Sequence, residues 1–225
     1  MWRLCTQKVR RRFRACCTFA SMSESREHWE QVYGTEAENE VSWFQADAQH
    51  SLAAIAACEL PPEAAILDVG GGASRLVDGL LARGYHKVSV LDLSSVALAA
   101  ARARLGEHGA AVRWIAADIK EFEPPQTYAL WHDRAAFHFL TDAAQRAAYM
   151  RVLERALLPG CHVVVSTFAP DGPERCSGLQ VQRYTADALA AEFGASFTLV
   201  SHERVAHVTP GGKIQPFTLV RLARR

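Results

Sequence analysis

The stretch from Ala64 to Arg75, AAILDVGGGASR, constrains the fold more than any other part of the sequence. A short apolar run of strand type ends in three consecutive glycines, and a helix-like pattern follows. Glycines at such a junction let the backbone turn tightly and pass close to a ligand, because no Cβ stands in the way. The stretch therefore predicts a nucleotide-like ligand lying across the carboxyl end of a parallel sheet.

Length and charge limit the classes of protein to which the chain can belong. Its 225 residues, 49% of them apolar, are enough for one α/β domain with a full core. Six of the 25 basic residues fall within residues 1–21, which hold no acid, so residues 22–225 are mildly acidic. We therefore expect no nucleic-acid partner. We also expect no membrane partner, because no apolar run reaches the roughly 20 residues that cross a bilayer.

Residues 1–21 form a basic leader that we expect to lie outside the fold, with a single domain over residues 22–225. Three interpretations stay open: an Arg-rich transit peptide of mitochondrial type, a basic arm, or an upstream extension of a protein that starts at Met22. The six cysteines lack C-x-x-C spacing, which argues against a disulfide framework or a metal site such as zinc. We predict a cytoplasmic protein, or a mitochondrial one if the leader is a transit peptide.

Hydrophobic periodicity predicts alternating strands and helices after the leader. The expected strands are 66–69, 87–92, 112–115, 128–131 and 162–167, and the expected helices are 23–32, 47–58, 74–82, 94–105, 142–157 and 185–193. The β segments 197–207 and 214–222 predict a terminal hairpin. Five βα units followed by a hairpin predict an α/β fold with a doubly wound, mostly parallel sheet and one antiparallel strand near an edge.

Two aspartates end the two strands that follow the glycine turn in the chain. Asp92 lies 24 residues after Asp68, where a carboxylate can accept hydrogen bonds from both ribose hydroxyls of an adenosine. Asp118 ends the next strand on the same rim, where it can accept from an adenine amine. Taken singly, either acid is also explained as an exposed strand end or a helix cap. The ordered set of glycines and two acids predicts an adenosine site.

A nicotinamide-dependent oxidoreductase is the alternative from another class. Its fingerprint, G-x-G-x-x-G/A, needs a small third residue because the helix packs closely on the strand there. Arg75 occupies that position, which argues against a dinucleotide-binding turn. A partner protein that keeps the fold without catalysis is a third possibility, and it predicts weak cofactor binding.

The motif LDVGGG of residues 67–72, with Asp92, Asp118 and the terminal hairpin, resembles the class I S-adenosylmethionine-dependent methyltransferases over about residues 24–222. The resemblance implies a Rossmann-like methyltransferase fold with S-adenosyl-L-methionine as cofactor. It implies that Gly70 and Gly72 contact the methionine part of the cofactor, and that Ser74 replaces the usual third glycine. It further implies that Asp92 holds the ribose and that Asp118 with Ile119 borders the adenine. Asp68, Gly71 and Leu93 complete the cofactor-binding set that it implies.

Two further segments bear on the acceptor. In the sequence WHDRAAFHFL, residues 131–140, the candidate catalytic groups are Asp133, expected to face the transferred methyl, and a histidine near the acceptor, either His132 or His138. The alternative is structural: an Asp133–Arg134 ion pair, with His138 in a helical turn. Trp43 belongs to a lid that packs on the core, closes over the cofactor, or does both.

A sulfonium donor is already activated, so orientation supplies most of the catalysis and no triad or metal cluster is needed. We predict a small-molecule acceptor such as a thiol or amine, since the chain has no added recognition domain and no basic face. Arg175 or Arg183 is a candidate partner for an anionic acceptor. Residues 131–160 are similar to the thiopurine methyltransferase group. The early motifs His28–Tyr33 and Ser42–Phe44 also resemble methyltransferase-like proteins that act on protein lysines, so a protein substrate is the alternative.

Overall fold

The computed structural model describes residues 22–225, and the predictions made for residues 1–21 lie outside this range. The helices are α1 (Met22–Thr35), α2 (Gln49–Ala56), α3 (Leu76–Ala82), α4 (Ser95–Leu105), α5 (Ala143–Ala156) and α6 (Ala186–Glu192), with short 3-10 turns η1 (Gly106–Ala111) and η2 (Phe137–Phe139). The strands are β1 (Ala65–Val69), β2 (Lys87–Asp92), β3 (Arg113–Ala116), β4 (Tyr128–Arg134), β5 (Leu157–Phe168), β6 (Arg175–Cys176), β7 (Leu179–Gln180), β8 (Phe197–Val208) and β9 (Ile214–Arg224).

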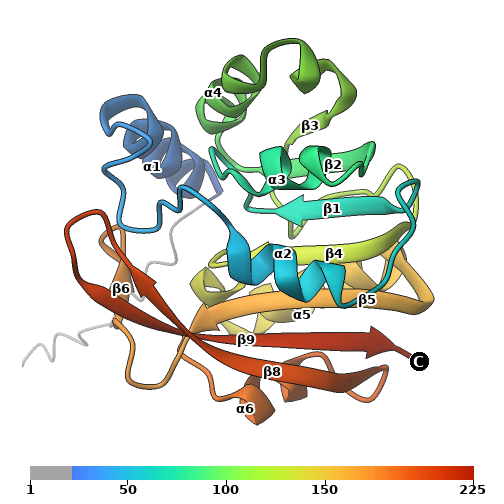
Figure 1. Ribbon diagram of the computed structural model, residues 1–225. Coiled ribbons are helices and arrows are strands. Elements are labelled where there is room, and N and C mark those ends of the chain that lie inside the picture. Colours follow the sequence, from blue (N-terminus) through green and yellow to red (C-terminus); the bar gives the residue numbers. More distant parts are fainter. Residues whose placement is uncertain (1–21) are drawn as a thin grey trace, which may run out of the picture.

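Seven strands form one twisted sheet in the order β3-β2-β1-β4-β5-β9-β8 (Figure 1). The five strands from β3 to β5 are parallel, whereas β9 runs antiparallel to both β5 and β8. The second, small sheet pairs β6 with β7. The predicted doubly wound, mostly parallel sheet with a terminal hairpin is therefore confirmed. Because the order reverses between β1 and β4, the carboxyl ends of these strands border the crevice where such folds bind ligands.

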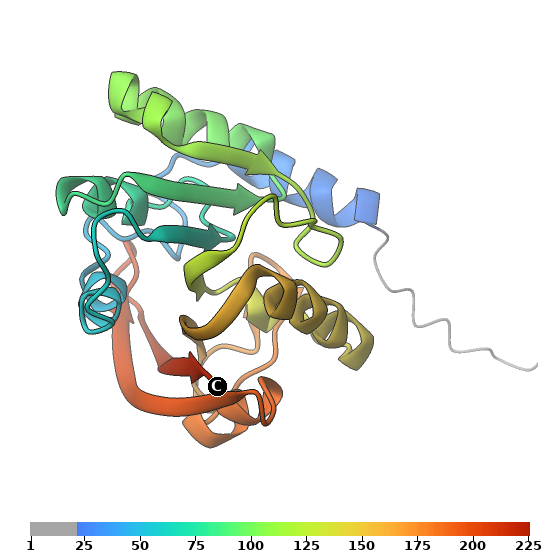
Figure 2. The ribbon, with the colours of Figure 1, turned by 90° about the vertical axis from the view of Figure 1, so that its right-hand side faces the viewer.

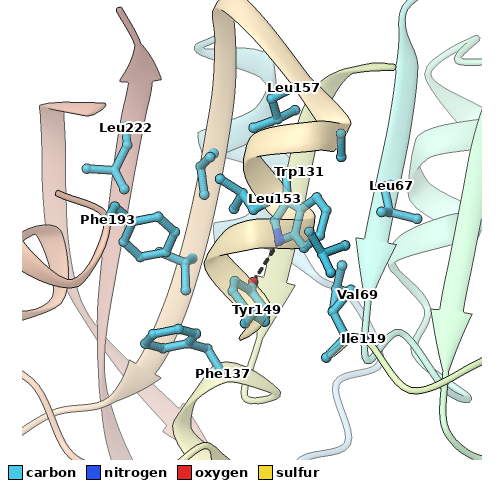
Figure 3. Packing of buried hydrophobic residues seen from close by; sticks show 14 of the residues in the cluster. Leu67, Val69, Ile119, Trp131, Phe137, Tyr149, Leu153, Leu157, Phe193 and Leu222 are labelled. Carbon is cyan, nitrogen blue, oxygen red and sulfur yellow. Dashed lines mark hydrogen bonds between the residues drawn. The ribbon is translucent and has the colours of Figure 1, made fainter. Parts of the chain in front are cut away.

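Alternation along the strands sends side chains to two separate cores. Leu67 and Val69 pack with α5 and α6 on one face, and Ile66 packs with α2, α3 and α4 on the other. Figure 2 shows α2 and α5 on opposite sides of the sheet. In the first core the Trp131 indole donates a 2.7 Å hydrogen bond to the Tyr149 hydroxyl, which satisfies both polar groups (Figure 3).

The structure differs from the sequence-based expectation at three places. Strand β4 continues past Trp131 to Arg134, and β5 begins at Leu157 rather than at His162. Pro159 and Gly160 therefore lie inside β5, where a register shift against β4 and a φ of +85° at Gly160 accommodate them. Among the described residues no helix joins β3 to β4, so the chain has four rather than five βα units before the hairpin. Two consecutive prolines, Pro124-Pro125, oppose a helix in that link.

Helix α1 and the small β6–β7 sheet lie together near the carboxyl end of the parallel strands (Figure 1). The His28 ring on α1 is hydrogen-bonded to the Ser177 hydroxyl between β6 and β7 at 3.3 Å. The Glu30 carboxylate accepts four hydrogen bonds from residues 94–96 and so covers the N-terminus of α4. These contacts hold α1 across the end of the sheet. Within residues 22–225, none of the helices is long and apolar enough to pass through a lipid bilayer.

Candidate active site

One cavity of about 610 Å³ opens among the carboxyl ends of the parallel strands. Gly70, Asp92 and Asp118, which follow three different strands, all line it. Other lining residues for which the sequence predicted cofactor contact are Leu93, Ile119 and Trp43. The volume falls within the roughly 300–1,000 Å³ of small-molecule sites. The structure thus brings most of the predicted cofactor-binding set to a single place.

The glycines of the turn meet close neighbours. Gly70 and Gly72 have φ values of +65° and +43°, which side chains with a Cβ rarely adopt. A Cβ on Gly70 would lie 2.5 Å from the Cβ of Ala136, and one on Gly72 would lie 2.8 Å from the Tyr33 hydroxyl. A Cβ on Gly71 would overlap the side chains packed beneath it. The three consecutive glycines therefore let the backbone turn and let other groups approach it.

The segment between the glycine turn and α3 is held by side-chain contacts that the sequence did not predict. Ser74, at the place of the expected third glycine, accepts a hydrogen bond from the Leu76 N–H at 3.1 Å and so helps to begin α3. Arg104 donates to the carbonyls of Ala73 and Ser74 at 2.9 and 2.8 Å. The same guanidinium is held by ion pairs to Glu38 and Asp78. Arg104 is thus a positioning residue for the turn, and only its place near the end of a predicted helix is visible in the sequence.

Asp92 is 8% exposed at the end of β2. Its Oδ1 accepts from the Ser94 N–H at 2.8 Å. Burial, with a further contribution from Asp68, raises the pKa of Asp92 to about 7, although the N–H groups of Ser94 and Gly72 oppose the shift. A buried carboxylate with remaining acceptor capacity suits a ligand that brings two hydroxyl donors.

Asp118 and Ile119 follow β3 and line the cavity. Asp118 accepts from the Lys120 N–H and forms an ion pair with the Lys120 ammonium, both at 2.9 Å. Ile119 is 8% exposed and joins the core under the cavity. Ile119 therefore provides an apolar surface beside the Asp118 carboxylate, which is paired with Lys120.

Asp68 faces a smaller hollow of about 50 Å³ next to the main cavity, lined also by His132 and Arg134. Its Oδ1 lies 2.7 Å from Nδ1 of His132, and Nε2 of this ring lies 2.9 Å from the Ser51 hydroxyl. All three side chains are buried. Asp68 therefore orients a buried histidine, and it does not line the main cavity with Asp92.

Asp133 does not reach the main cavity. Its side chain is fully buried, with Oδ1 accepting from the N–H groups of Ala136 and Phe137 and Oδ2 accepting from the Tyr149 hydroxyl at 2.9 Å. Burial raises the pKa of Asp133 to about 6, against the effect of these donors. The expectation that it faces the transferred methyl is not supported, because its acceptor atoms shape the turn after β4 instead.

His138 is fully buried as well, and neither ring nitrogen has a hydrogen-bond partner in residues 22–225. The ring packs against Phe139 and Phe168, with centroids 4.5 and 4.9 Å away. Burial, helped by the charge of Arg134, lowers the pKa of His138 to about 3. The imidazole is therefore neutral and outside the cavity lining, which argues against the predicted role of base.

Arg134 has no ion pair with Asp133, contrary to the structural alternative. Consecutive strand residues point to opposite faces, and Arg134 lies on the face of Phe217, whose ring centroid is 4.8 Å from its Cζ. Its Nη1 donates to the Trp43 carbonyl at 3.1 Å, and its Nη2 is buried without a partner in the described chain. Burial lowers the pKa of Arg134 to about 10, so the group stays charged at neutral pH. Arg134 is among the residues that line both the main cavity and the small hollow.

Aromatic rings cover the same end of the cavity. Trp29 on α1 packs edge-on against Phe139 and Trp43, at centroid distances of 5.1 and 5.8 Å. Tyr33 lies 6.1 Å from Trp43, and its hydroxyl reaches the glycine turn. Trp43, in the predicted lid, therefore packs against the same core cluster as Phe139 and lines the cavity at the same time.

A family profile described as a methyltransferase domain matches residues 66–160, from β1 into β5. This segment contains the glycine turn, Asp92 and Asp118. It includes strands β1 to β4 and the beginning of β5, which are neighbours in the main sheet. The chain therefore carries a methyltransferase domain over these residues. A search of curated proteins found no match.

Solved structures share the fold of this methyltransferase. A protein studied in the conversion of a disulfide bond into a thioacetal group during echinomycin biosynthesis is similar at a TM-score of 0.72 and 22% identity, covering 88% of this chain and 92% of that one. The 1,6-didemethyltoxoflavin-N1-methyltransferase of Burkholderia thailandensis is similar at 0.67 and 22%, covering 92% of each. The N-methyltransferase NodS of Bradyrhizobium japonicum is similar at 0.64 and 17%, covering 87% and 97%.

The residues of the methyltransferase fit the cofactor of its family. Gly70 lines the cavity without a Cβ, and the Asp92 carboxylate has free acceptor capacity in the same cavity. Gly71 and Gly72 do not line it, because the side chains of Asp68, Val90 and Tyr33 pack against them. Asp118 with Ile119 provides an acid beside an apolar wall. The resemblance to the thiopurine group stays a prediction.

Sequence reasoning missed part of the lining of the methyltransferase. Tyr33, Ala136 and Cys176 come from separate segments, and only folding brings them beside the glycine turn and Arg134. Of the two arginines expected to face an anionic acceptor, Arg175 lines the cavity. Arg183 does not, because it pairs with Glu174 and donates to a loop carbonyl.

Proposed function

We propose that the protein transfers a methyl group from S-adenosylmethionine to a small-molecule acceptor that carries a thiol or an amine. The observation that carries the proposal is the single cavity that joins Gly70, Asp92 and Asp118 to the aromatic rings of the lid. Because α1 and the β6–β7 sheet cover the cavity, it suits an acceptor small enough to fit entirely inside it. Similar folds are named for small acceptors, among them 1,6-didemethyltoxoflavin.

The chain's own residues would divide the binding between them. Asp92 would accept hydrogen bonds from the ribose hydroxyls, with Leu93 beside it. The turn at Gly70–Gly72 would contact the methionine part, and Asp118 with Ile119 would border the adenine. When bound, S-adenosylmethionine supplies the methyl group from its sulfonium and leaves as a neutral thioether. The electron-rich faces of Trp29 and Trp43 would stabilise positive charge nearby.

The cavity lining also limits the chemistry of the acceptor. No histidine lines the main cavity within residues 22–225, and its acids lie at the ends of β2 and β3. Burial raises the pKa of the Cys176 thiol to about 11, and burial also raises that of the Tyr33 phenol, so neither is a base at neutral pH. An acceptor that is already nucleophilic, such as a thiolate or a weakly basic amine, fits this lining. Positioning would then supply most of the rate.

A transfer assay with cofactor labelled on the methyl group tests the proposal. Aromatic and aliphatic thiols, small amines and a cell-lysate protein fraction are offered in parallel to the full chain. We expect label in small molecules. Label confined to the protein fraction would replace the proposal by protein methylation, and tighter binding of NADH than of S-adenosylhomocysteine would replace it by hydride transfer.

A further inference from the structure

The charges that line the cavity are not balanced. Its acids are Asp92 and Asp118, and Asp118 is already paired with Lys120. Arg134 and Arg175 have no carboxylate partner in the described residues, and Arg175 donates only to the Gly178 carbonyl at this site. The lining therefore carries more positive than negative charge at neutral pH.

Within residues 22–225, the groups in contact with the Arg134 guanidinium carry no negative charge. The ring of Phe217 covers its face, and the Trp43 carbonyl accepts from Nη1. The nearby His138 is neutral because burial lowers its pKa, and burial keeps the Cys176 thiol protonated. A guanidinium with a buried, unpartnered nitrogen is costly, and it is stabilised most by a ligand that brings an anion.

The cofactor adds no net negative charge to the cavity. Its methionine part carries one ammonium and one carboxylate, and its sulfonium adds a further positive charge. Binding it makes the cavity more positive, so an anionic second ligand is favoured by both the protein and the donor. The rings of Trp29 and Phe139 at this end favour a flat body for that ligand.

We propose that Arg134 binds an anionic group of the methyl acceptor, and that the acceptor is an aromatic carboxylic acid bearing a thiol or amine. The proposal rests on the function proposed above and names its substrate class. Planar carboxylates match the fork of a guanidinium, which donates two parallel hydrogen bonds to them. Arg175, at the exposed rim of the same cavity, would attract the acid without fixing its position.

The test measures binding by calorimetry to the full chain saturated with S-adenosylhomocysteine. The probes are matched pairs that differ in one charge: 2-mercaptobenzoate with 2-mercaptobenzamide, and 2-aminobenzoate with 2-aminobenzamide. We expect each acid to bind at least about tenfold more tightly than its amide. Arg134→Met should abolish this preference and Arg134→Lys should restore part of it. Arg183→Met, which alters an arginine outside the cavity, should leave the preference intact.

Three outcomes would overturn the proposal. One is that the unaltered chain binds acid and amide equally tightly, or binds neither of them. Another is an acid preference that survives in Arg134→Met. The third is a loss of S-adenosylhomocysteine affinity in Arg134→Met with no loss for 5′-methylthioadenosine, which would assign Arg134 to the carboxylate of the cofactor. Failure of the unaltered chain to bind S-adenosylhomocysteine at all would instead refute the proposed function. Circular dichroism melts of each variant confirm that the chain is folded.

Discussion

The cavity has one end at which we propose that the adenosine binds (the adenosine end) and another at which we propose that the acceptor binds (the acceptor end). The two ends are built in different ways. The adenosine end is made of residues that directly follow parallel strands, so the sheet itself fixes Gly70, Asp92 and Asp118. The acceptor end is assembled from α1, the link around Trp43, the turn after β4 and the β6–β7 sheet. The first end can be shared by many proteins with this fold, because loops that vary do not contribute to it.

The ends also differ in how their polar groups are satisfied. Asp92 accepts from backbone donors and keeps capacity for more, whereas Arg134 has a nitrogen with no partner in the described residues. This difference predicts that changes at the adenosine end act on cofactor affinity. Changes at the acceptor end should act on the choice of acceptor.

Asp92→Ala should produce the largest effect on cofactor binding. Loss of two hydrogen bonds to a carboxylate would weaken S-adenosylhomocysteine binding about 100-fold, measured by calorimetry. Asp171→Asn is the matched control, because Asp171 is exposed and pairs with Arg204. An affinity unchanged in Asp92→Ala would show that the ribose assignment is wrong.

Gly72→Ala should weaken S-adenosylhomocysteine binding by about tenfold, because its Cβ would meet the Tyr33 hydroxyl at 2.8 Å in a strained backbone. Gly84→Ala is the control: its φ is +85°, but nothing lies within 4 Å of an added Cβ. Both variants should lose about 1 kcal/mol of unfolding free energy. If both also lost affinity equally, close approach at the turn would not be the cause.

The pH dependence of cofactor affinity should follow Asp92. Ribose hydroxyls donate to the ionised carboxylate, so S-adenosylhomocysteine affinity should rise by about tenfold between pH 6 and pH 8 around the pKa of about 7. Calorimetry of Asp92→Asn should give a flat profile over this range. A profile that is unchanged in the variant would place the titrating group elsewhere.

The stability of the ligand-free protein should change in the opposite direction. The folded-state pKa of Asp92, about 7, and of Asp133, about 6, are above the values of an unfolded aspartate. The folded protein therefore binds more protons, and its unfolding free energy falls as pH rises from about 4 to 7. Thermal melts should show this decline, with a shallower slope in Asp92→Asn. A rise in melting temperature over the window would contradict the assignment.

The smallest effect is expected at His138. The ring is neutral, buried and unpartnered, so His138→Phe should leave methyl transfer within about threefold and should not lower the melting temperature. A rate that falls 100-fold with unchanged cofactor affinity would restore the role of His138 as a base.

The strands and the adenosine rim were predictable because each signal is local. A strand, its terminal residue and the following helix cap are contiguous in sequence, as at Asp92 and Ser94. The same reasoning ended β4 too early, at Trp131. His132 and Asp133 look like loop residues, yet Asp68 and Tyr149 satisfy them in the buried strand. Their partners lie 64 and 16 residues away, so the sequence shows no sign of this burial.

The acceptor end could not be predicted for a related reason. Trp29, Trp43 and Phe139 were visible as aromatic residues, but their mutual contacts depend on how three segments fold over the sheet. Arg134 was placed beside Asp133 by proximity in sequence. Because β4 continues to Arg134, the side chains of Asp133 and Arg134 alternate like those of other strand residues. They therefore lie on opposite faces of the sheet.

Glu30 joins the first helix to the segment that follows Asp92. Its carboxylate accepts four hydrogen bonds from residues 94–96, directly after the loop in which the Ser94 N–H supports Asp92. Any movement of α1 that widens the entrance breaks these bonds and exposes the N–H groups of Ser95 and Val96. We therefore expect the residence time of a bound nucleoside to depend on Glu30, although this side chain does not line the cavity.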